Sequence, residues 1–164
     1  MSQSQMLLIL GAVLMFSFIT LTAHRTVMTA STRQLESEYV ITAAEIAETL
    51  TNEIKSKAFD EAVTNGATVT DVNAFTVYLG PGVNEYPGGY DDVDDYITDN
   101  SKNMPLVFTT PRAGNFTATV SVNYVKPQQP TTVSYTPTRT KRIRISVSAA
   151  RLPQALVLTS FVSY

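Results

Sequence analysis

The first apolar run of the chain extends from Met6 to Ala23 and contains neither a charged residue nor a proline. At a rise of about 1.5 Å per residue, a helix over these positions is roughly 27 Å long, close to the thickness of the hydrocarbon core of a bilayer. A helix that is apolar on every side is stable only when it is deeply buried or lies in lipid. We therefore expect this segment to enter a membrane at some stage.

The next segment, from Thr26 to Glu61, has no proline and no glycine, and its apolar residues recur every three or four positions. This spacing is typical of a helix with one apolar face, and most of the acidic residues lie away from that face. The face comprises Leu35, Tyr39, Ala43, Ile46, Leu50, Ile54 and Ala58. The pattern predicts a single helix that is capped by Ser4 and ends near Val63, ahead of the Asn65-Gly66 pair.

After residue 66 the apolar residues alternate with polar ones, which is the pattern of strands with one buried face. We expect strands over 74–79, 104–109, 116–124 and 142–148, and a last hairpin over 154–164. Together they form an antiparallel sheet of four or five strands, whose apolar face needs a cover. The helix supplies that cover, and the residues predicted to pack it onto the sheet are Leu35, Tyr39, Ile46, Leu50 and Ile54.

The predicted fold class is therefore α+β. Residues 1–63 form a long N-terminal helix, apolar over 1–23 and amphipathic over 24–63, and residues 64–164 form a β-rich globular head. The segment from Lys126 to Thr138 contains three prolines, too many for an interior strand. It is either an exposed hairpin arm that touches a neighbouring subunit or a floppy surface loop.

Charge is distributed unevenly along the chain. Residues 1–23 carry none, residues 24–99 carry four basic and all fourteen acidic side chains, and residues 100–164 carry eight basic and no acidic ones. The formal net charge of -2 therefore hides two regions of opposite sign. Such regions either pair within one head or draw copies of the chain together. Because the chain has no cysteine, the head relies on packing rather than on disulfides.

An apolar helical half that continues into an amphipathic half, followed by a β-rich head, resembles a type IV pilin or pilin-like filament subunit of a divergent branch. The resemblance implies a basic leader that a leader peptidase removes, so we expect Met1 to be a processed, methylated end. It also implies an inner-membrane precursor that the pilus assembly machinery builds into an extracellular filament. Two positions depart from the family: Gln5 stands where most pilins have a glutamate, and Thr20 to Thr22 lack the usual helix-breaking proline.

The leading functional prediction is a homopolymer of identical subunits whose apolar helical halves stack in the core of a filament. The residues expected to carry that assembly are Gln5, Met6, Leu7, Leu8, Ile9, Leu10, Val13, Leu14, Phe16, Phe18 and Ile19. Two alternatives stay open. The chain could be a minor pilin or pseudopilin of a secretion or pilus machine, or a single-pass membrane-anchored binding protein.

A loop of clustered carboxylates supplies the candidate metal site. Asp91, Asp92, Asp94 and Asp95 lie in a glycine-flanked segment, and calcium takes six to eight oxygen ligands. The spacing is not that of an EF-hand, and the alternative is a solvated acidic loop that faces the basic sheet of the next subunit. No other cofactor is predicted.

The sequence offers little for catalysis. His24 is the only histidine and borders the apolar run, which removes histidine-based triads and multi-histidine metal sites. Gly80-Pro81-Gly82 lacks the lysine and helix of a phosphate loop. The basic stretch 139–144 more readily meets an acidic protein surface than nucleic acid. We therefore expect a structural protein and not an enzyme.

Overall fold

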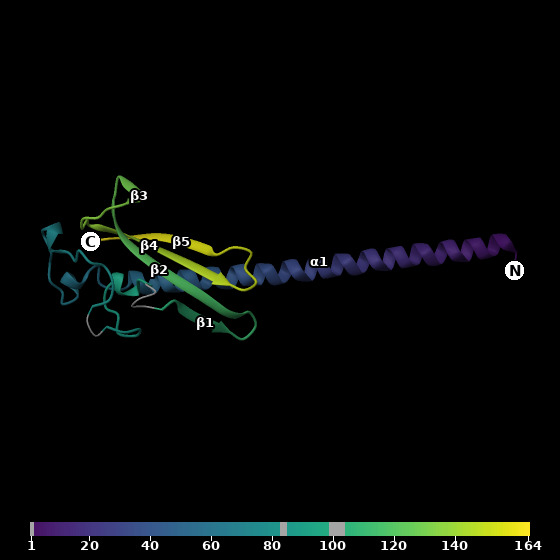
Figure 1. Ribbon diagram of the computed structural model, residues 1–164, viewed down its shortest axis with the longest axis horizontal. Coiled ribbons are helices and arrows are strands. Elements are labelled where there is room, and N and C mark those ends of the chain that lie inside the picture. The colour runs from purple at the N-terminus through teal and green to yellow at the C-terminus, as the bar shows by residue number, and fades with distance from the viewer. Residues whose placement is uncertain (1, 83–84, 99–103) are drawn as a thin grey trace. The chain divides into compact units, whose positions relative to one another are not determined.

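The computed structural model describes residues 2–82, 85–98 and 104–164. The chain divides into two compact units, Met1–Glu38 and Tyr39–Tyr164, called here the N-terminal unit and the head unit. One helix, α1 (Gln3–Lys55), begins in the first unit and ends in the second, and short 3-10 turns and an antiparallel sheet follow it (Figure 1). The α+β prediction, with a pilin-like arrangement of a long N-terminal helix and a sheet, is confirmed.

The start of α1 is closed by Ser2 and Gln5. The Ser2 hydroxyl accepts a hydrogen bond from the Gln5 backbone N–H at 3.4 Å, and the Gln5 side-chain oxygen accepts one from the Ser2 backbone N–H at 3.1 Å. This reciprocal pair is a capping box, in which a serine and a glutamine three residues later satisfy each other's backbone donors. The prediction that Ser4 caps the helix is wrong, because Ser4 already lies within the first turn.

The end of α1 also differs from the prediction. The helix stops at Lys55 rather than near Val63. Beyond it, Ala58 forms an isolated parallel bridge with Asp92, and the Lys57 ammonium donates to the Tyr90 carbonyl at 2.7 Å. These contacts with a distant loop replace helical hydrogen bonds, which helical spacing alone could not foretell.

The sheet is antiparallel and has the strand order β1-β2-β4-β5. Its strands are β1 (Leu106–Thr110), β2 (Gly114–Lys126), β4 (Thr140–Ala149) and β5 (Leu156–Ser163), and β3 (Gln129–Val133) pairs with the far end of β2. The long β2–β4 ladder runs from Phe116 opposite Ala149 to Tyr124 opposite Lys141. Four of the predicted strand regions are thereby confirmed, with β5 returning from β4 as the last hairpin.

The predicted strand at Ala74–Leu79 is wrong. Val72–Ala74 is a 3-10 turn whose cap, Asp71, accepts a hydrogen bond from the Asn73 backbone N–H at 3.0 Å. An aspartate that binds the backbone two residues on favours a turn over a strand. Phe75 is buried in a separate aromatic cluster with Phe59, where the two ring centroids lie 5.1 Å apart.

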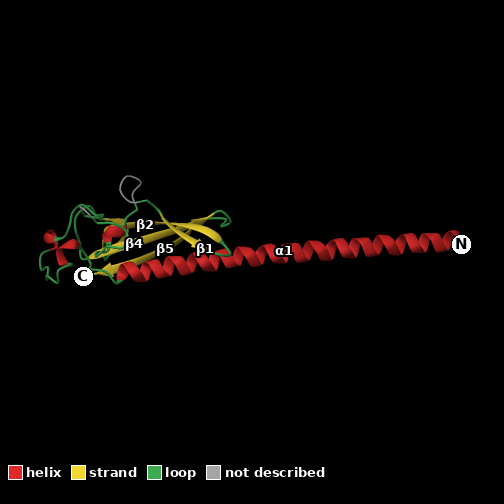
Figure 2. Cartoon of the chain, turned by 90° about the horizontal axis from the view of Figure 1, so that it is seen from below, coloured by secondary structure: helices red, strands yellow, loops and turns green. Residues whose placement is uncertain are grey.

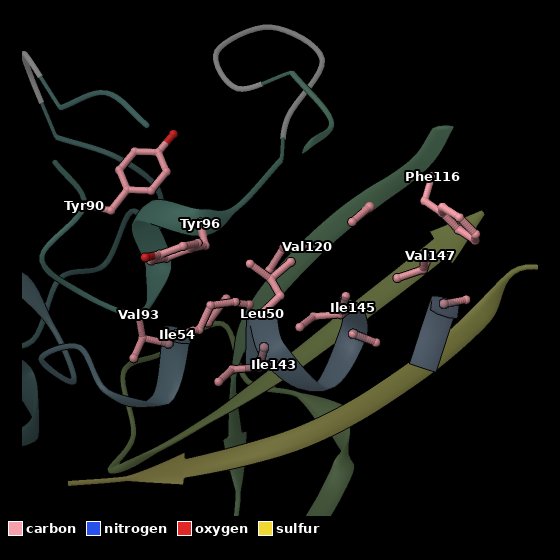
Figure 3. Close-up of a cluster of buried hydrophobic side chains, with 14 of the residues drawn as sticks. Leu50, Ile54, Tyr90, Val93, Tyr96, Phe116, Val120, Ile143, Ile145 and Val147 are labelled. Carbon is pink, nitrogen blue, oxygen red and sulfur yellow. The ribbon is translucent and has the colours of Figure 1, made fainter. Parts of the chain in front are cut away.

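The main core lies between the second part of α1 and one face of the sheet (Figures 2 and 3). From α1 it takes one stripe, and from β2 and β4 it takes every second residue, as expected for helical and strand periods. Its members on these elements are Tyr39, Ala43, Ala47, Leu50 and Ile54 on α1, Phe116, Ala118, Val120 and Val122 on β2, and Ile143, Ile145 and Val147 on β4. The packing predicted for Tyr39, Leu50 and Ile54 is therefore confirmed.

Ile46 is partly buried and packs against this core, so its predicted packing is also confirmed. Leu35 belongs to the N-terminal unit and its side chain is 43% exposed, and its packing against the sheet stays a prediction. Within the head unit the stripe begins at Tyr39, whose ring centroid lies 5.9 Å from that of Phe116, the first residue of the β2–β4 ladder.

The proline-rich segment forms a hairpin arm. β3 pairs with the end of β2, and its first four residues are exposed, including Pro130. The Arg142 guanidinium holds the arm by donating to the Thr131 carbonyl at 2.8 Å. Of the two alternatives drawn from the sequence, the exposed arm is the one found, and its contact with a neighbouring subunit stays a prediction.

Candidate functional site

The first candidate site is the apolar helix surface, defined as the side chains of Met6 to Ile19 on α1. Its large apolar side chains are between 51% and 74% exposed, and an 18-residue window of the helix has a mean hydropathy of 2.4 with none of it buried within the protein. The predicted assembly residues on this surface are Met6, Leu7, Leu8, Ile9, Leu10, Val13, Leu14, Phe16, Phe18 and Ile19. By length and composition, α1 is able to cross a membrane.

Hydroxyl groups along the same helix are satisfied internally. Thr20 and Thr22 donate to the carbonyls of Phe16 and Phe18, each at 2.8 Å. Thr26, Thr29 and Thr32 likewise each donate to the carbonyl four residues earlier. A threonine that bonds to the carbonyl four residues earlier presents little unsatisfied polarity to its surroundings. These threonines are therefore compatible with lipid or with closely packed helices around them.

The second candidate site is the acidic loop, and the structure places its carboxylates in different roles. Asp92 accepts hydrogen bonds from the backbone N–H groups of Asp94 and Asp95 at 2.7 and 3.2 Å. Asp95 accepts from those of Asp91 and Asp92, both at 3.0 Å. Asp92, Asp94 and Asp95 are buried and Asp91 is exposed. The loop thus uses its own carboxylates to satisfy its own backbone.

A buried ionic cluster, formed by Lys141, Asp60 and Asp94, adjoins this loop. The Lys141 ammonium donates to the carboxylates of Asp60, at 2.9 Å, and Asp94, and the three side chains are at most 2% exposed. Its third hydrogen bond goes to the Phe59 carbonyl at 2.6 Å. This cluster was not predicted from the sequence, although the alternation in β4 indicates it: Lys141 lies two residues before Ile143, on the face that turns inward.

Asp60 is held as an anion within this cluster. Burial opposes its charge, but hydrogen bonds from Tyr124, Lys141 and Thr76 outweigh that effect and leave the pKa of Asp60 below its usual value. The same anion, together with burial, raises the pKa of the Tyr124 hydroxyl far above its usual value. The Tyr124 hydroxyl therefore stays protonated and donates a hydrogen bond to Asp60, at 2.7 Å.

In contrast to Asp60, both Asp92 and Asp94 have a raised pKa. Burial and the neighbouring charge of Asp94 raise the pKa of Asp92 to about 8. Burial likewise raises the pKa of Asp94, although Lys141 partly offsets that rise. The loop therefore tends to hold protons on buried carboxyl groups where an exposed aspartate would be ionised.

A cavity of about 320 Å³ opens beside these groups. It is lined by Tyr78, Leu79 and Ile97 among others, and the carboxylates in its wall are Glu61, Glu85, Asp92, Asp94 and Asp95. Burial and the charges of nearby aspartates raise the pKa of Glu61. For Glu85, a hydrogen bond from the Gly82 N–H lowers the pKa, but burial and Asp95 together outweigh this effect, and the pKa is raised overall. The wall of this cavity carries an excess of acidic groups.

The calcium prediction stays a prediction, and the structure changes which oxygens it involves. Glu61, Glu85 and Asp91 each bring a carboxylate oxygen within 4.8 Å of the others, a spacing that one cation can bridge. Of the four predicted ligands, only Asp91 belongs to this set. The other three direct carboxylate oxygens to the backbone, and Asp94 also binds Lys141.

Comparison with models of protein families, with curated proteins and with solved structures finds no match to this chain. The pilin-like arrangement is therefore a statement about architecture alone: a long helix, apolar over its first part, and an antiparallel sheet that packs on its second part.

Proposed function

We propose that this chain is a structural subunit of a pilus-like extracellular filament and that it polymerises through the apolar helix surface. Before assembly it is held in the inner membrane by the same surface, after a leader peptidase has removed a basic leader. The pilus assembly machinery then moves it from lipid into the filament. The chain has no enzymatic role in this proposal.

The observation that carries the proposal is an 18-residue apolar window, none of it buried, in a helix that belongs to a folded protein. Large contiguous apolar surfaces on proteins mark sites that are covered by lipid or by a partner. The second part of the same helix has only one apolar stripe, and the sheet covers it. A helix whose first part is uncovered and whose second part is covered by the sheet suits a subunit that packs its first part against sister copies.

The energetics favour such packing. Burying a large aliphatic or aromatic side chain stabilises by roughly 1.5–3 kcal/mol relative to leaving it in water. The ten apolar side chains of the predicted assembly set could therefore hold a filament together without covalent links between subunits. Gln5 adds an amide that can hydrogen-bond to a neighbouring chain terminus, without the charge that a glutamate would bring.

The test is electron microscopy of material sheared from cells that express the chain, combined with labelling by an antibody against the head. Labelled fibres support the proposal, and a chain that stays in the membrane fraction as a monomer overturns it. Mass spectrometry of the N-terminus in the same material asks whether Met1 is a processed and methylated end.

A second candidate function is favoured by the acidic cavity. A single-pass anchored protein that binds a cationic ligand would also have an exposed apolar helix and a head with a carboxylate-lined cavity. This candidate predicts that the full chain is monomeric in detergent and that charge-neutral substitutions of Glu61 and Glu85 abolish ligand binding. The filament proposal predicts that the same substitutions leave fibre formation unchanged.

A further inference from the structure

The buried ionic cluster brings an amine against two carboxyl groups from distant parts of the chain. Lys141 comes from β4, Asp60 follows α1, and Asp94 lies in a 3-10 turn of the acidic loop. The Phe59 and Tyr124 rings flank the amine, with centroids 4.8 and 5.2 Å from the Lys141 nitrogen. An amine and a carboxyl group are thus held in contact in a buried, aromatic environment.

We propose that the Lys141 side-chain nitrogen and the Asp60 carboxyl carbon join in an intramolecular amide bond, with Asp94 as the group that moves the protons. The bond would link the segment after α1 to β4, between residues that are 81 positions apart in the chain. It concerns the head unit alone and does not depend on the filament proposal.

The two oxygens of Asp60 are in different surroundings, as this reaction requires. Oδ1 accepts three hydrogen bonds, from the Ala62 N–H at 3.2 Å and from the N–H and hydroxyl of Thr76, both at 3.0 Å. Oδ2 lies 2.9 Å from the Lys141 nitrogen, accepts from the Tyr124 hydroxyl at 2.7 Å and receives the shared Thr76 N–H at the longer distance of 3.3 Å. Donors aimed at one oxygen stabilise the negative charge that develops there when a nucleophile adds to the carboxyl carbon. Oδ2 is then the oxygen that leaves.

The atoms balance without any further reactant. Asp94 takes a proton from the Lys141 ammonium and passes it to Oδ2 of Asp60, so that the Asp60 carboxyl group is neutral when the free amine adds to its carbon and Oδ1 becomes an oxyanion. Asp94 then takes a second proton from the nitrogen and passes it to Oδ2 as well. The carbon–Oδ2 bond breaks, one water molecule leaves, and an amide N–H remains. No electron is gained or lost.

Asp94 suits the role of proton carrier because one of its carboxylate oxygens accepts a hydrogen bond from the Lys141 amine, so that a proton can pass directly between the two groups. Asp60 suits the role of electrophile because the oxygen that would carry the developing charge, Oδ1, accepts three hydrogen bonds. The corresponding oxygen of Asp94, Oδ2, accepts one from the Gly80 N–H at 3.1 Å.

The reaction also removes a cost that the ion pair carries. An ammonium and a carboxylate buried together lose their hydration, and their attraction repays this loss only in part. The amide carries no charge, and the water molecule that is released can leave through the adjoining cavity, whose wall includes Asp94. In a chain without cysteine, such a bond would do the work of a disulfide by restricting the unfolded chain.

The deciding experiment is mass spectrometry of the intact full chain, purified in detergent and measured under denaturing conditions. The proposal expects a mass lower by one water molecule than that of the same chain without the bond. Lys141→Arg keeps the positive charge but has no amine that can add to a carboxyl group, and its mass should equal that of its sequence. A wild-type chain without the deficit overturns the proposal, whether or not the variant folds.

Tryptic peptides then locate the bond. Trypsin cleaves after Lys57 and Lys102, so Asp60 and Asp94 lie on one peptide, and a modified Lys141 resists cleavage and remains attached to it. Fragment ions that place the bond at Asp60 support the assignment, and a bond at Asp94 overturns it. Asp94→Asn should lower the bonded fraction at least several-fold, and Asp91→Asn, an exposed change in the same loop, should not. Equal bonded fractions in the two variants would overturn the role of Asp94.

Discussion

The N-terminal unit and the head unit differ in how the apolar residues of α1 are covered. In the head unit, apolar residues of α1 recur as one stripe, and the alternating residues of β2 and β4 cover that stripe within the same chain. In the N-terminal unit, apolar residues surround the helix and remain exposed. The comparison teaches that the head can be stable by its own packing, whereas the apolar helix surface needs lipid or other helices.

The largest effect is expected where the N-terminal unit depends on its surroundings. Leu14→Asp places a charge in the middle of the apolar helix surface, where the side chain is 63% exposed. A charge at the centre of a membrane helix costs at least about 2.5–3.5 kcal/mol, and a buried unpaired charge in a filament core is also unfavourable. We expect loss of fibres from sheared supernatants, measured by electron microscopy and immunoblotting.

The matched control for that change is Ser121→Asp, which adds the same charge at an exposed position of β2 in the head. Fibres and head stability should survive it. If Leu14→Asp assembled as well as the control, the apolar helix surface would have no role in assembly.

The next prediction compares the loss of a side chain that packs on the covered stripe with the loss of one on the exposed part of the helix. Phe116 is fully buried and packs on Tyr39, so Phe116→Ala should lower the free energy of unfolding of the head by about 3–5 kcal/mol. Leu35→Ala removes an apolar side chain that is 43% exposed and should change it by less than about 1 kcal/mol. Chemical denaturation of the full chain in detergent, followed by a head-specific probe, measures both. Similar losses would show that the stripe extends to Leu35.

A smaller, pH-dependent effect tests the buried carboxyl groups of the head. The folded-state pKa of Asp92 is about 8, well above its usual value. The folded state therefore binds more protons than the unfolded state between about pH 4 and pH 8, and this group's contribution to stability falls as pH rises through that window, by at most about 1.4 kcal/mol per pH unit. Asp92→Asn keeps the side-chain oxygen that accepts two backbone N–H groups and should flatten the dependence between pH 5 and pH 8.

In chains that lack the amide bond, where Asp60 keeps a free carboxyl group, Asp60 acts in the opposite sense in the same titration. Its pKa is lowered in the folded state, so its contribution is present above the unfolded-state pKa and is lost as pH falls through and below that value. A fall in stability below about pH 4 that survives in Asp92→Asn is therefore expected. A wild-type stability that rose between pH 5 and pH 8 would contradict the assignment to Asp92.

The smallest effect concerns the first turn of α1. Ser2→Ala removes the hydroxyl that accepts from the Gln5 N–H, and loss of such a cap costs about 1 kcal/mol. We expect faster hydrogen exchange in the first turn of the helix and none of this change in the head unit. Ser17→Ala is the matched variant, because Ser17 lies well inside α1 and away from the cap, and it should leave the exchange rates of the first turn nearly unchanged. Equal acceleration in the two variants would remove Ser2 from the cap.

The sequence by itself determined the features that depend on local periodicity. The uncharged run up to Ala23 and the spacing of Tyr39, Leu50 and Ile54 suffice for a long helix with two kinds of surface. The alternation around Val120 and Ile145 suffices for the central strands. These predictions were correct because helical and strand periods decide which side chains share a face, and burial of that face decides the element.

Tertiary structure alone decided where the helix ends, which residues of the loop are strand or turn, and what the carboxylates do. α1 ends at Lys55, and the residues just beyond it bind a distant loop: Lys57 donates to the Tyr90 carbonyl, and Ala58 forms a bridge with Asp92. Asp60, Asp94 and Lys141 meet only once the sheet has packed, although the inward phase of Lys141 could be predicted. Contacts between positions far apart in the chain have no period, so their energies enter only after folding has brought those positions together.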